Sequence, residues 1–243
     1  GREKCKKCNK SRRYYCYTCF LPVDSVAANF PKVKLPLSVD IIKHPNEIDG
    51  KSTAAHAAVI APDDVTVYSF PDIPHYDQPH RVVLVYPSRT SSNMEEFLDD
   101  AKVVGVETES SSSLDEQVPL GQKRKADSPT ENANSKRSRA DLCPFDKVVF
   151  IDSTWAQVTK IASDVRLKDI RRIEMKSQTT KFWRPQQGKP DTYLATIEAI
   201  YYFFREFHLT FINPEYDGCY DNLLFLFNFM YHKIKELSNG GKE

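Results

Sequence analysis

Four cysteines near the N-terminus have the spacing of a metal site. They form two Cys-x2-Cys pairs separated by seven residues: Cys5, Cys8, Cys16 and Cys19. Two such pairs allow four thiolates to converge on one zinc ion, and a site closed by four protein ligands is structural. Two disulfides are the alternative, but Cys143 and Cys219 are distant and have no obvious partners, which favours a reducing compartment. We therefore expect a zinc ribbon over residues 1–21, in which the ion replaces a hydrophobic core.

A second chemically capable group follows an apolar run. After Lys147–Ile151, the segment Asp152–Trp155 contributes an acid, two hydroxyls and an indole. A short run rich in β-branched residues predicts a buried parallel strand, and ligands of open α/β sheets bind outside the carboxyl ends of such strands. The alternative is that Asp152 or Ser153 only caps a helix that follows.

Two basic stretches suggest contact with a polyanion. Residues 2–13 carry seven Lys or Arg against one acid, and residues 160–189 carry nine against three. In a chain of formal net charge +1, such stretches indicate local affinity for nucleic acid, with a solvated surface as the alternative. Tyrosines between the first cations could stack on unpaired bases or form the ribbon's own core. The cations that we expect to contact nucleic acid are Lys6, Lys7, Arg12, Arg13, Lys181 and Lys189.

Strands and helices that could position these groups are predicted from residue 37 onward. A hydrophobic content of 40% is enough for a core, and no apolar run approaches the roughly 18 to 20 residues of a membrane span. We expect strands over residues 37–43, 65–70, 81–88, 147–152 and 170–175. We expect helices over residues 54–60, 93–101, 156–165, 193–207 and 220–237, with Ser52 or Thr53 capping the first and Asn93 the second. Aromatic stripes in the last two helices predict core or a subunit interface.

One segment inside this domain, which we assign to residues 37–243, has the composition of a disordered insertion. Residues 105–141 are serine-rich, with few large apolar side chains and no periodicity. They contain two basic clusters about ten residues apart, a spacing typical of a bipartite nuclear import signal, with a merely solubilising loop as the alternative. The residues of this signal are Lys123, Arg124, Lys125, Lys136, Arg137 and Arg139. We therefore expect the protein in the nucleus.

Five motifs, taken together and in order, resemble the DTW-domain tRNA-uridine aminocarboxypropyltransferase family, close to the first of its two eukaryotic paralogue groups. They are the cysteine ribbon, His44-Pro45-x-Glu47 with Lys51-Ser52-Thr53, Leu84–Ser88, Asp152–Trp155 and Leu194–Ala199. Two positions depart from the pattern: Ser153, where many members have glycine or another small residue, and Ala195, which is often serine. We therefore assign Ser153 no chemical role.

The resemblance implies an α/β fold related to the SPOUT methyltransferases, with helices on both faces of a parallel sheet and a C-terminal trefoil knot. It implies S-adenosylmethionine bound among three loops after parallel strands, which here would be Tyr86–Ser88, Asp152–Trp155 and residues 182–196. The implied reaction transfers the 3-amino-3-carboxypropyl group to N3 of a uridine in the tRNA D-loop and releases methylthioadenosine. The implied partner is tRNA; because no apolar run is long enough to span a membrane, we expect no membrane partner.

Roles for individual residues follow from this implied reaction. Asp152 is the candidate base, because the imide N3–H of uridine must be deprotonated before N3 can attack. Arg184 or Lys189 could bind the methionyl carboxylate, Trp155 could stack or merely pack, and Glu198 could bind the amino group or only occupy a favourable first helical turn. The residues that we expect to contact the cofactor are Tyr86, Pro87, Ser88, Thr154, Trp155, Arg184, Leu194, Thr196 and Glu198.

Two other functions compete with this one. The first is an RNA methyltransferase of the same superfamily, and the second is a non-catalytic nuclear zinc-ribbon protein that binds RNA. The polar ends of the predicted strands argue against the second, because a protein that only binds RNA would not need them. The sequence leaves open which uridine is modified and how many copies of the chain associate.

Overall fold

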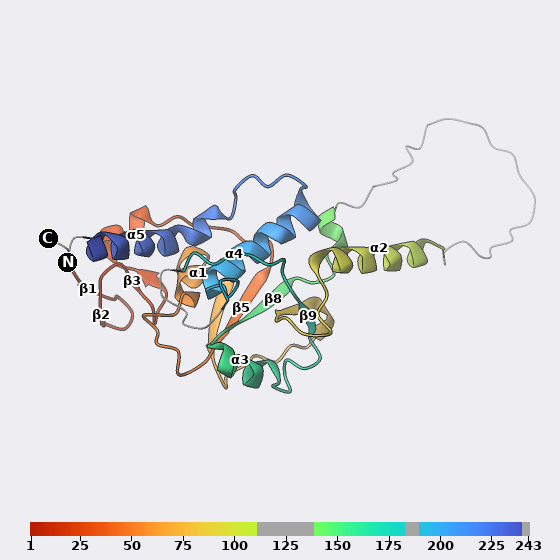
Figure 1. Ribbon diagram of the computed structural model, residues 1–243, viewed down its shortest axis with the longest axis horizontal. Helices are drawn as coiled ribbons and strands as arrows, with labels where there is room; N and C mark the ends of the chain where they lie inside the picture. The colour runs from red at the N-terminus through yellow and green to blue at the C-terminus, as the bar shows by residue number, and fades with distance from the viewer. Residues whose placement is uncertain (111–138, 183–189, 240–243) are drawn as a thin grey trace, which may run out of the picture.

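A five-stranded parallel sheet lies at the centre of the computed structural model, which describes residues 1–110, 139–182 and 190–239 (Figure 1). Its strands are β5 (Ser38–Lys43), β6 (Val65–Ser69), β7 (Val82–Val85), β8 (Lys147–Asp152) and β9 (Arg171–Ile173). Their order across the sheet is β6-β5-β8-β7-β9, and every neighbouring pair is parallel. The central strand is therefore β8, paired with β5 on one side and β7 on the other.

Helices cover both faces of this sheet. The main helices are α1 (Ala54–Ile60), α2 (Met94–Ser110), α3 (Trp155–Ala162), α4 (Thr196–Phe207) and α5 (Phe225–Asn239). Short helical turns are η1 (Asp24–Asn29), η2 (Pro79–Arg81), η3 (Arg139–Leu142), η4 (His208–Ile212) and η5 (Asp221–Leu224). Figure 1 shows α1 and α4 on one face and α3 on the other. No helix among the described residues is both long and apolar enough to cross a membrane.

The alternation of side chains along β8 creates a separate core on each face. Val148 and Phe150 pack into the larger core with residues of α1, α4 and α5, whereas Val149 packs into the smaller core with Ile161 of α3. Successive residues of a strand point to opposite faces, so a strand covered on both sides is apolar at consecutive positions. The same alternation directs Asp152 toward the face of Phe150, beneath α1 and α4.

The predicted elements are present, with differences at their ends. Helix α1 spans residues 54–60 as predicted, and Asn93 caps α2 because its Oδ1 accepts the Glu96 backbone N–H at 3.0 Å. Helix α2 continues to Ser110 and η3 begins at Arg139, and residues 111–138, most of the insertion predicted at about 105–141, lie outside the described residues. The segment predicted as one helix over 220–237 consists of η5 and α5.

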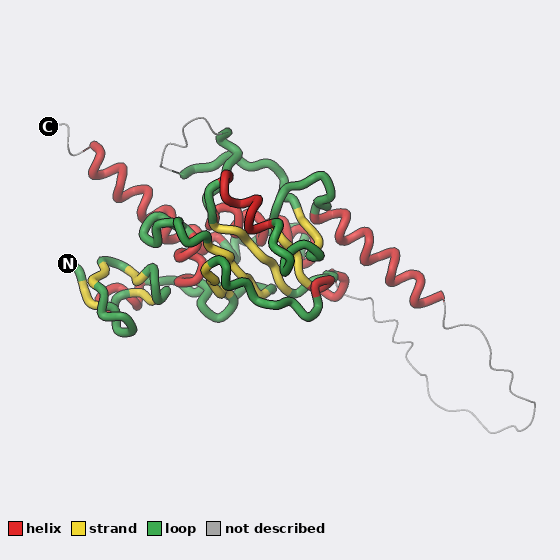
Figure 2. The backbone as a smooth tube through the Cα atoms, turned by 90° about the horizontal axis from the view of Figure 1, so that it is seen from below, coloured by secondary structure: helices red, strands yellow, loops and turns green. Residues whose placement is uncertain are grey.

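The N-terminal cysteine ribbon is formed by two small hairpins that dock on the helices. Strand β1 (Glu3–Lys4) pairs with β2 (Ser11–Arg12), and β3 (Tyr15–Cys16) pairs with β4 (Leu21–Pro22), both antiparallel. Figure 2 shows these hairpins at one end of the molecule. The Tyr14 ring meets Phe229 of α5 edge to face at 4.8 Å, and the Tyr15 hydroxyl lies 2.9 Å from His56 Nε2 in α1. These two tyrosines therefore serve packing, which was the alternative to base stacking.

Candidate functional site

A pocket of about 250 Å³ lies at the carboxyl ends of three adjacent strands, β8, β7 and β9. The strands contribute residues at or just beyond their ends, and the segment entering α4 contributes Thr192, Leu194 and Thr196. Val158 of α3 adds to the wall. The lining residues are Val85, Tyr86, Pro87, Phe150, Ile151, Ser153, Val158, Ile173, Glu174, Met175, Lys176, Ser177, Gln178, Thr192, Leu194, Thr196 and Ala199. This is the edge of an open α/β sheet where ligands bind.

Asp152 lies beside this pocket and joins three elements. Its Oδ2 accepts a hydrogen bond from the Ser52 hydroxyl at 2.6 Å, and its Oδ1 accepts one from the Thr196 hydroxyl at 2.5 Å. Its backbone carbonyl accepts the His44 N–H at 2.9 Å. The residue is 6% exposed, and both carboxylate oxygens are satisfied by hydroxyls that precede α1 and begin α4. Asp152 does not cap α3, whose N-cap is Thr154, so the helix-cap alternative is wrong.

The start of α4 is held by side chains from other parts of the chain. Ala195 stands at the N-cap and has no side-chain acceptor; instead the Thr53 hydroxyl accepts the Ile197 N–H at 3.2 Å. The buried carboxylate of Glu198 accepts the Ala195 N–H at 2.9 Å and two groups of the preceding loop, the Thr180 hydroxyl at 2.6 Å and the Lys181 N–H at 2.7 Å. Acids are favoured in the first turn because of the helix dipole. Glu198 thus lies in the first turn of α4, the second of its two predicted roles, and it also anchors the loop that follows β9, which was not predicted.

Four of the predicted cofactor contacts line the pocket: Tyr86, Pro87, Leu194 and Thr196. Ser88 follows the end of β7, where its N–H donates to Ser91 Oγ at 3.1 Å, and Thr154 is the exposed N-cap of α3. Neither of these two residues lines the pocket. Glu198 does not line it either, and its carboxylate is hydrogen-bonded to other groups of the protein.

Arg184 and Lys189 lie outside the described residues, as do five residues of the predicted import signal, Lys123, Arg124, Lys125, Lys136 and Arg137. Arg139 opens η3, and Trp155 is the first residue of α3.

Sequence reasoning missed the segment after β9, residues 174–178. It lines the pocket with Glu174, Lys176 and Gln178, and its position is set by hydrogen bonds: the Lys176 N–H donates to Glu206 at 2.9 Å, and its ammonium donates to Glu95 at 2.7 Å. The predicted strand over 170–175 ends at Ile173 in the structure, so these residues form a loop. The available signal was the change from apolar to polar residues after Ile173, which repeats the pattern of β7 and β8.

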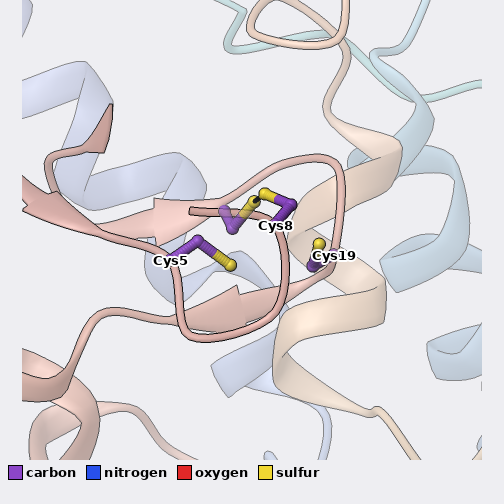
Figure 3. A group of neighbouring side chains, drawn as sticks. Cys5, Cys8 and Cys19 are labelled. Carbon is purple, nitrogen blue, oxygen red and sulfur yellow. Dashed lines mark hydrogen bonds between the residues drawn. The ribbon is translucent and has the colours of Figure 1, made fainter. Parts of the chain in front are cut away.

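The four cysteines of the ribbon converge on one point. Their sulfur atoms all lie within 4.8 Å of one another, and Cys8 Sγ is 3.6 Å from Cys16 Sγ (Figure 3). None of the four is in a disulfide. Each Cys-x2-Cys pair comes from the turn of a knuckle, where local backbone geometry brings both thiols to the same side. Four sulfurs at this spacing have the donor set and the separation of a tetrahedral zinc site.

Electrostatics in the cluster also favour a cation at its centre. Burial would raise the pKa of the Cys16 thiol, but the backbone N–H groups of Thr18 and Cys19 and the Arg12 guanidinium lower that pKa to about 6. For Cys19, burial and the neighbouring sulfurs raise the pKa to about 12. One thiolate therefore forms readily, while ionisation of a neighbour beside it is opposed. A divalent cation would remove this opposition, because it stabilises all four thiolates together.

Arg12 differs from the other cations predicted to contact nucleic acid. It is 6% exposed, its guanidinium lies 3.9 Å from the centre of the Tyr17 ring, and it donates to the Thr18 hydroxyl at 3.2 Å. It is thus part of the ribbon's interior beside Cys16, and the structure contradicts its predicted role on the surface. Lys6, Lys7, Arg13 and Lys181 are exposed, although Lys6 forms an ion pair with Asp24 at 2.8 Å.

Comparisons with known proteins place these features in a family. Residues 13–235 match the DTW domain. Three of the most similar curated proteins are all called tRNA-uridine aminocarboxypropyltransferase 1. The protein from Xenopus tropicalis is 48% identical over 97% of this chain and 80% of its own length. Those from Mus musculus and Homo sapiens are 45% and 44% identical over 100% of this chain and 80% and 81% of their own lengths. No solved structure matches the chain.

Proposed function

This chain belongs to the DTW-domain family, and on that premise we propose that it is a tRNA-uridine aminocarboxypropyltransferase. It transfers the 3-amino-3-carboxypropyl group of S-adenosylmethionine to N3 of a uridine in the D-loop of tRNA. The observation that carries this proposal is the pocket at the ends of β7, β8 and β9, in a chain that aligns over nearly its whole length with transferases of that name.

The pocket suits the proposed methionyl and adenosyl groups. Val85, Ile173 and Leu194 supply an apolar wall of the kind that receives an adenine ring, while hydroxyls and amides of the loops supply polar contacts. Lys176 is the one cation among the described lining residues, so it joins Arg184 and Lys189 as a candidate for binding the methionyl carboxylate. When bound, S-adenosylmethionine supplies an electrophilic γ-carbon whose bond to the sulfonium breaks as N3 bonds to that carbon.

The protein itself must position the substrates and remove one proton. Uridine N3–H is a weak acid, so a carboxylate within hydrogen-bond reach would accept its proton. Asp152 is our candidate, because its neighbours Ile151, Ser153 and Thr196 line the pocket. The Ser52 and Thr196 hydroxyls would hold the carboxylate in one orientation while a further lone pair on each oxygen stays available. Accurate placement of this kind lowers the barrier by reducing the entropy lost on reaching the transition state.

We assign the remaining features to substrate recognition, stability and location. The ribbon would bind zinc, and exposed Lys6, Lys7, Arg13 and Lys181 would contact tRNA phosphates. The parallel sheet, with pocket loops after three of its strands, supports a SPOUT-like fold with a C-terminal knot. The two basic clusters would import the protein into the nucleus. A fluorescent fusion that stays cytoplasmic, or whose location is unchanged when both clusters are replaced by alanine, would exclude that import role.

The position of the label in S-adenosylmethionine tests the reaction directly. Purified protein is incubated with unmodified tRNA and cofactor labelled either at the carboxyl carbon or at the methyl group. We expect label in tRNA only from the carboxyl position, with methylthioadenosine as co-product. A matched tRNA in which every D-loop uridine is replaced by cytidine should take up none. Label from the methyl group would identify a methyltransferase, and tRNA binding without any transfer would identify a binding protein.

A further inference from the structure

A second group of metal-ligating side chains lies beyond the end of α4. The ligand atoms of His208, Asp217 and Cys219 all lie within 4.8 Å of one another. Among the described residues, this is the only such group besides the four cysteines. It lies away from the pocket, because α4 spans 12 residues from Thr196 to Phe207, and a rise of 1.5 Å per residue gives about 18 Å. The reaction at the pocket therefore leaves this group unexplained.

Hydrogen bonding prepares His208 as a metal ligand. Its Nε2 lies 3.2 Å from the backbone carbonyl oxygen of Glu215, which can only accept, so Nε2 carries the proton. The unprotonated Nδ1 then faces Cys219 Sγ at 3.6 Å. Metal-binding histidines are commonly held in this way, with the second nitrogen donating to a carbonyl or carboxylate. The residue is 5% exposed and its ring meets those of Tyr216 and Tyr220 edge to face, so its orientation is constrained from several sides.

The loop after η4 is shaped to bring the other two ligands to His208. Gly218 has a φ of +84°, in the left-handed region that favours glycine, and it separates Asp217 from Cys219. The Cys219 N–H donates to Asp217 Oδ1 at 3.0 Å, which keeps the carboxylate next to the thiol. Asp221 Oδ1 accepts hydroxyls from Tyr216 at 2.9 Å and Tyr201 at 3.0 Å, and so ties the loop to α4. Asp217 and Cys219 are exposed, so an ion has a path from solvent.

We propose that His208, Asp217 and Cys219 bind a zinc ion, with water as the fourth ligand. A thiolate together with an imidazole favours zinc over magnesium or calcium, and one thiolate, one imidazole and one carboxylate fit a four-coordinate site that is open at one position. The separation from the pocket places the ion outside the transferase reaction, where it would fasten the loop of residues 213–220 to the end of α4. Zinc binding at this place does not depend on the transferase reaction.

The experiment counts zinc ions on the full chain. Protein purified with micromolar zinc is analysed by elemental mass spectrometry, and we expect two ions per chain. Cys219→Ser and Asp217→Asn each remove one exposed ligand, so each variant should retain one ion. Its affinity for the second ion should fall by at least ~100-fold, because loss of a direct ligand should cost no less than the largest loss seen when an outer-shell partner is removed. Cys143→Ser is the matched control, because the Cys143 thiol donates to the Phe145 carbonyl outside both clusters; it should retain two ions.

Cobalt substitution distinguishes the two sites spectroscopically. A four-thiolate site and a one-thiolate site differ in the strength of their sulfur-to-cobalt charge-transfer absorption. Cys219→Ser should therefore remove only the weaker absorption bands, which come from the one-thiolate site. Circular dichroism of each variant verifies that the chain is folded. A single zinc ion in the wild-type protein, or a second ion that persists in both Cys219→Ser and Asp217→Asn, would show that this cluster is held by hydrogen bonds alone and would overturn the proposal.

Discussion

The cysteine ribbon and the Asp152 junction, which we define as Asp152 with its hydrogen-bond donors Ser52 and Thr196, both hold reactive groups in place. They bring these groups together over different distances along the chain. The ribbon takes its four sulfurs from residues 5–19, and two local turns bring them together. The junction takes its groups from Ser52, Asp152 and Thr196, which meet only because β8 lies beside β5 and beneath α4. Loss of one ligand should therefore unfold the ribbon alone. Substitutions at the junction should instead affect catalysis at the pocket and the stability of the whole sheet domain.

Loss of a ribbon ligand should have the largest effect, because the zinc ion that we propose there would supply most of the ribbon's folding free energy. Structural zinc contributes roughly 10–16 kcal/mol in isolated zinc peptides. In Cys8→Ser we expect the ribbon to lose its zinc and residues 1–22 to become sensitive to protease, while the sheet domain stays folded. Limited proteolysis followed by mass spectrometry measures this, with Cys143→Ser as the control. If residues 1–22 stay resistant to protease after a strong chelator has been added, the ribbon is not held together by a metal ion.

Replacing the carboxylate of the junction should stop catalysis without undoing the fold. The amide of Asp152→Asn can accept from one hydroxyl and donate to the other, so the variant removes the charge and keeps the contacts. We expect product formation to fall by at least ~100-fold, the lower range for loss of a general base, while S-adenosylmethionine affinity changes by no more than a few-fold. Rapid-quench assays and calorimetry measure the two quantities.

Glu174→Gln provides the matched control for that experiment, since Glu174 is the carboxylate that lines the pocket among the described residues. Its carboxylate accepts the Ser91 hydroxyl at 2.8 Å, and we expect it to affect turnover much less than Asp152. If Asp152→Asn instead abolishes cofactor binding or lowers thermal stability strongly, Asp152 is an anchor or a ligand. If Glu174→Gln produces the larger loss of turnover, the base is misassigned.

Removing one hydroxyl from the junction should cost stability. Ser52→Ala or Thr196→Val leaves one oxygen of a buried carboxylate without its donor, which costs about 1–3 kcal/mol. Denaturant unfolding of each variant measures this loss, and Thr192→Val, an exposed position at the same pocket, should change stability little. The double variant should be non-additive because both hydroxyls serve the same carboxylate. Additive losses would show that the two hydroxyls act independently.

We expect the smallest effects from replacing single cations of the ribbon. These substitutions distinguish a cation on the surface of the ribbon from one in its interior. Lys7→Gln removes an exposed cation and should weaken tRNA binding slightly, with a reduction of about one in the slope of log affinity against log salt. Arg12→Gln should leave that slope unchanged and weaken zinc retention, because Arg12 is buried beside Cys16. Salt-dependent binding curves measure the first effect and chelator competition the second. An equal change of slope in both variants would place Arg12 on the tRNA surface.

Prediction from sequence succeeded where a short pattern determines local structure. The apolar run at Lys147–Ile151 predicted a buried strand because a strand covered on both faces needs apolar side chains at consecutive positions, and β8 is that strand. Asn93 was identified as a cap from its place before an acidic first turn, and its Oδ1 accepts the Glu96 N–H. Prediction placed the end of this helix at residue 101, whereas α2 ends at Ser110, because no proline between residues 102 and 110 marks a stop.

Spacing and periodicity over a few residues were enough to predict the cysteine ribbon, the polar strand ends and the resemblance to a family. The contacts that those groups make depend on how the chain folds. In the folded chain Asp152 accepts hydrogen bonds from Ser52 and Thr196. The Thr53 hydroxyl supplies the cap that Ala195 lacks, and Arg12 is buried beside Cys16. The physical reason is that a buried polar group must find a partner wherever the sheet places one, and strand order, which no local pattern specifies, decides which partner is near.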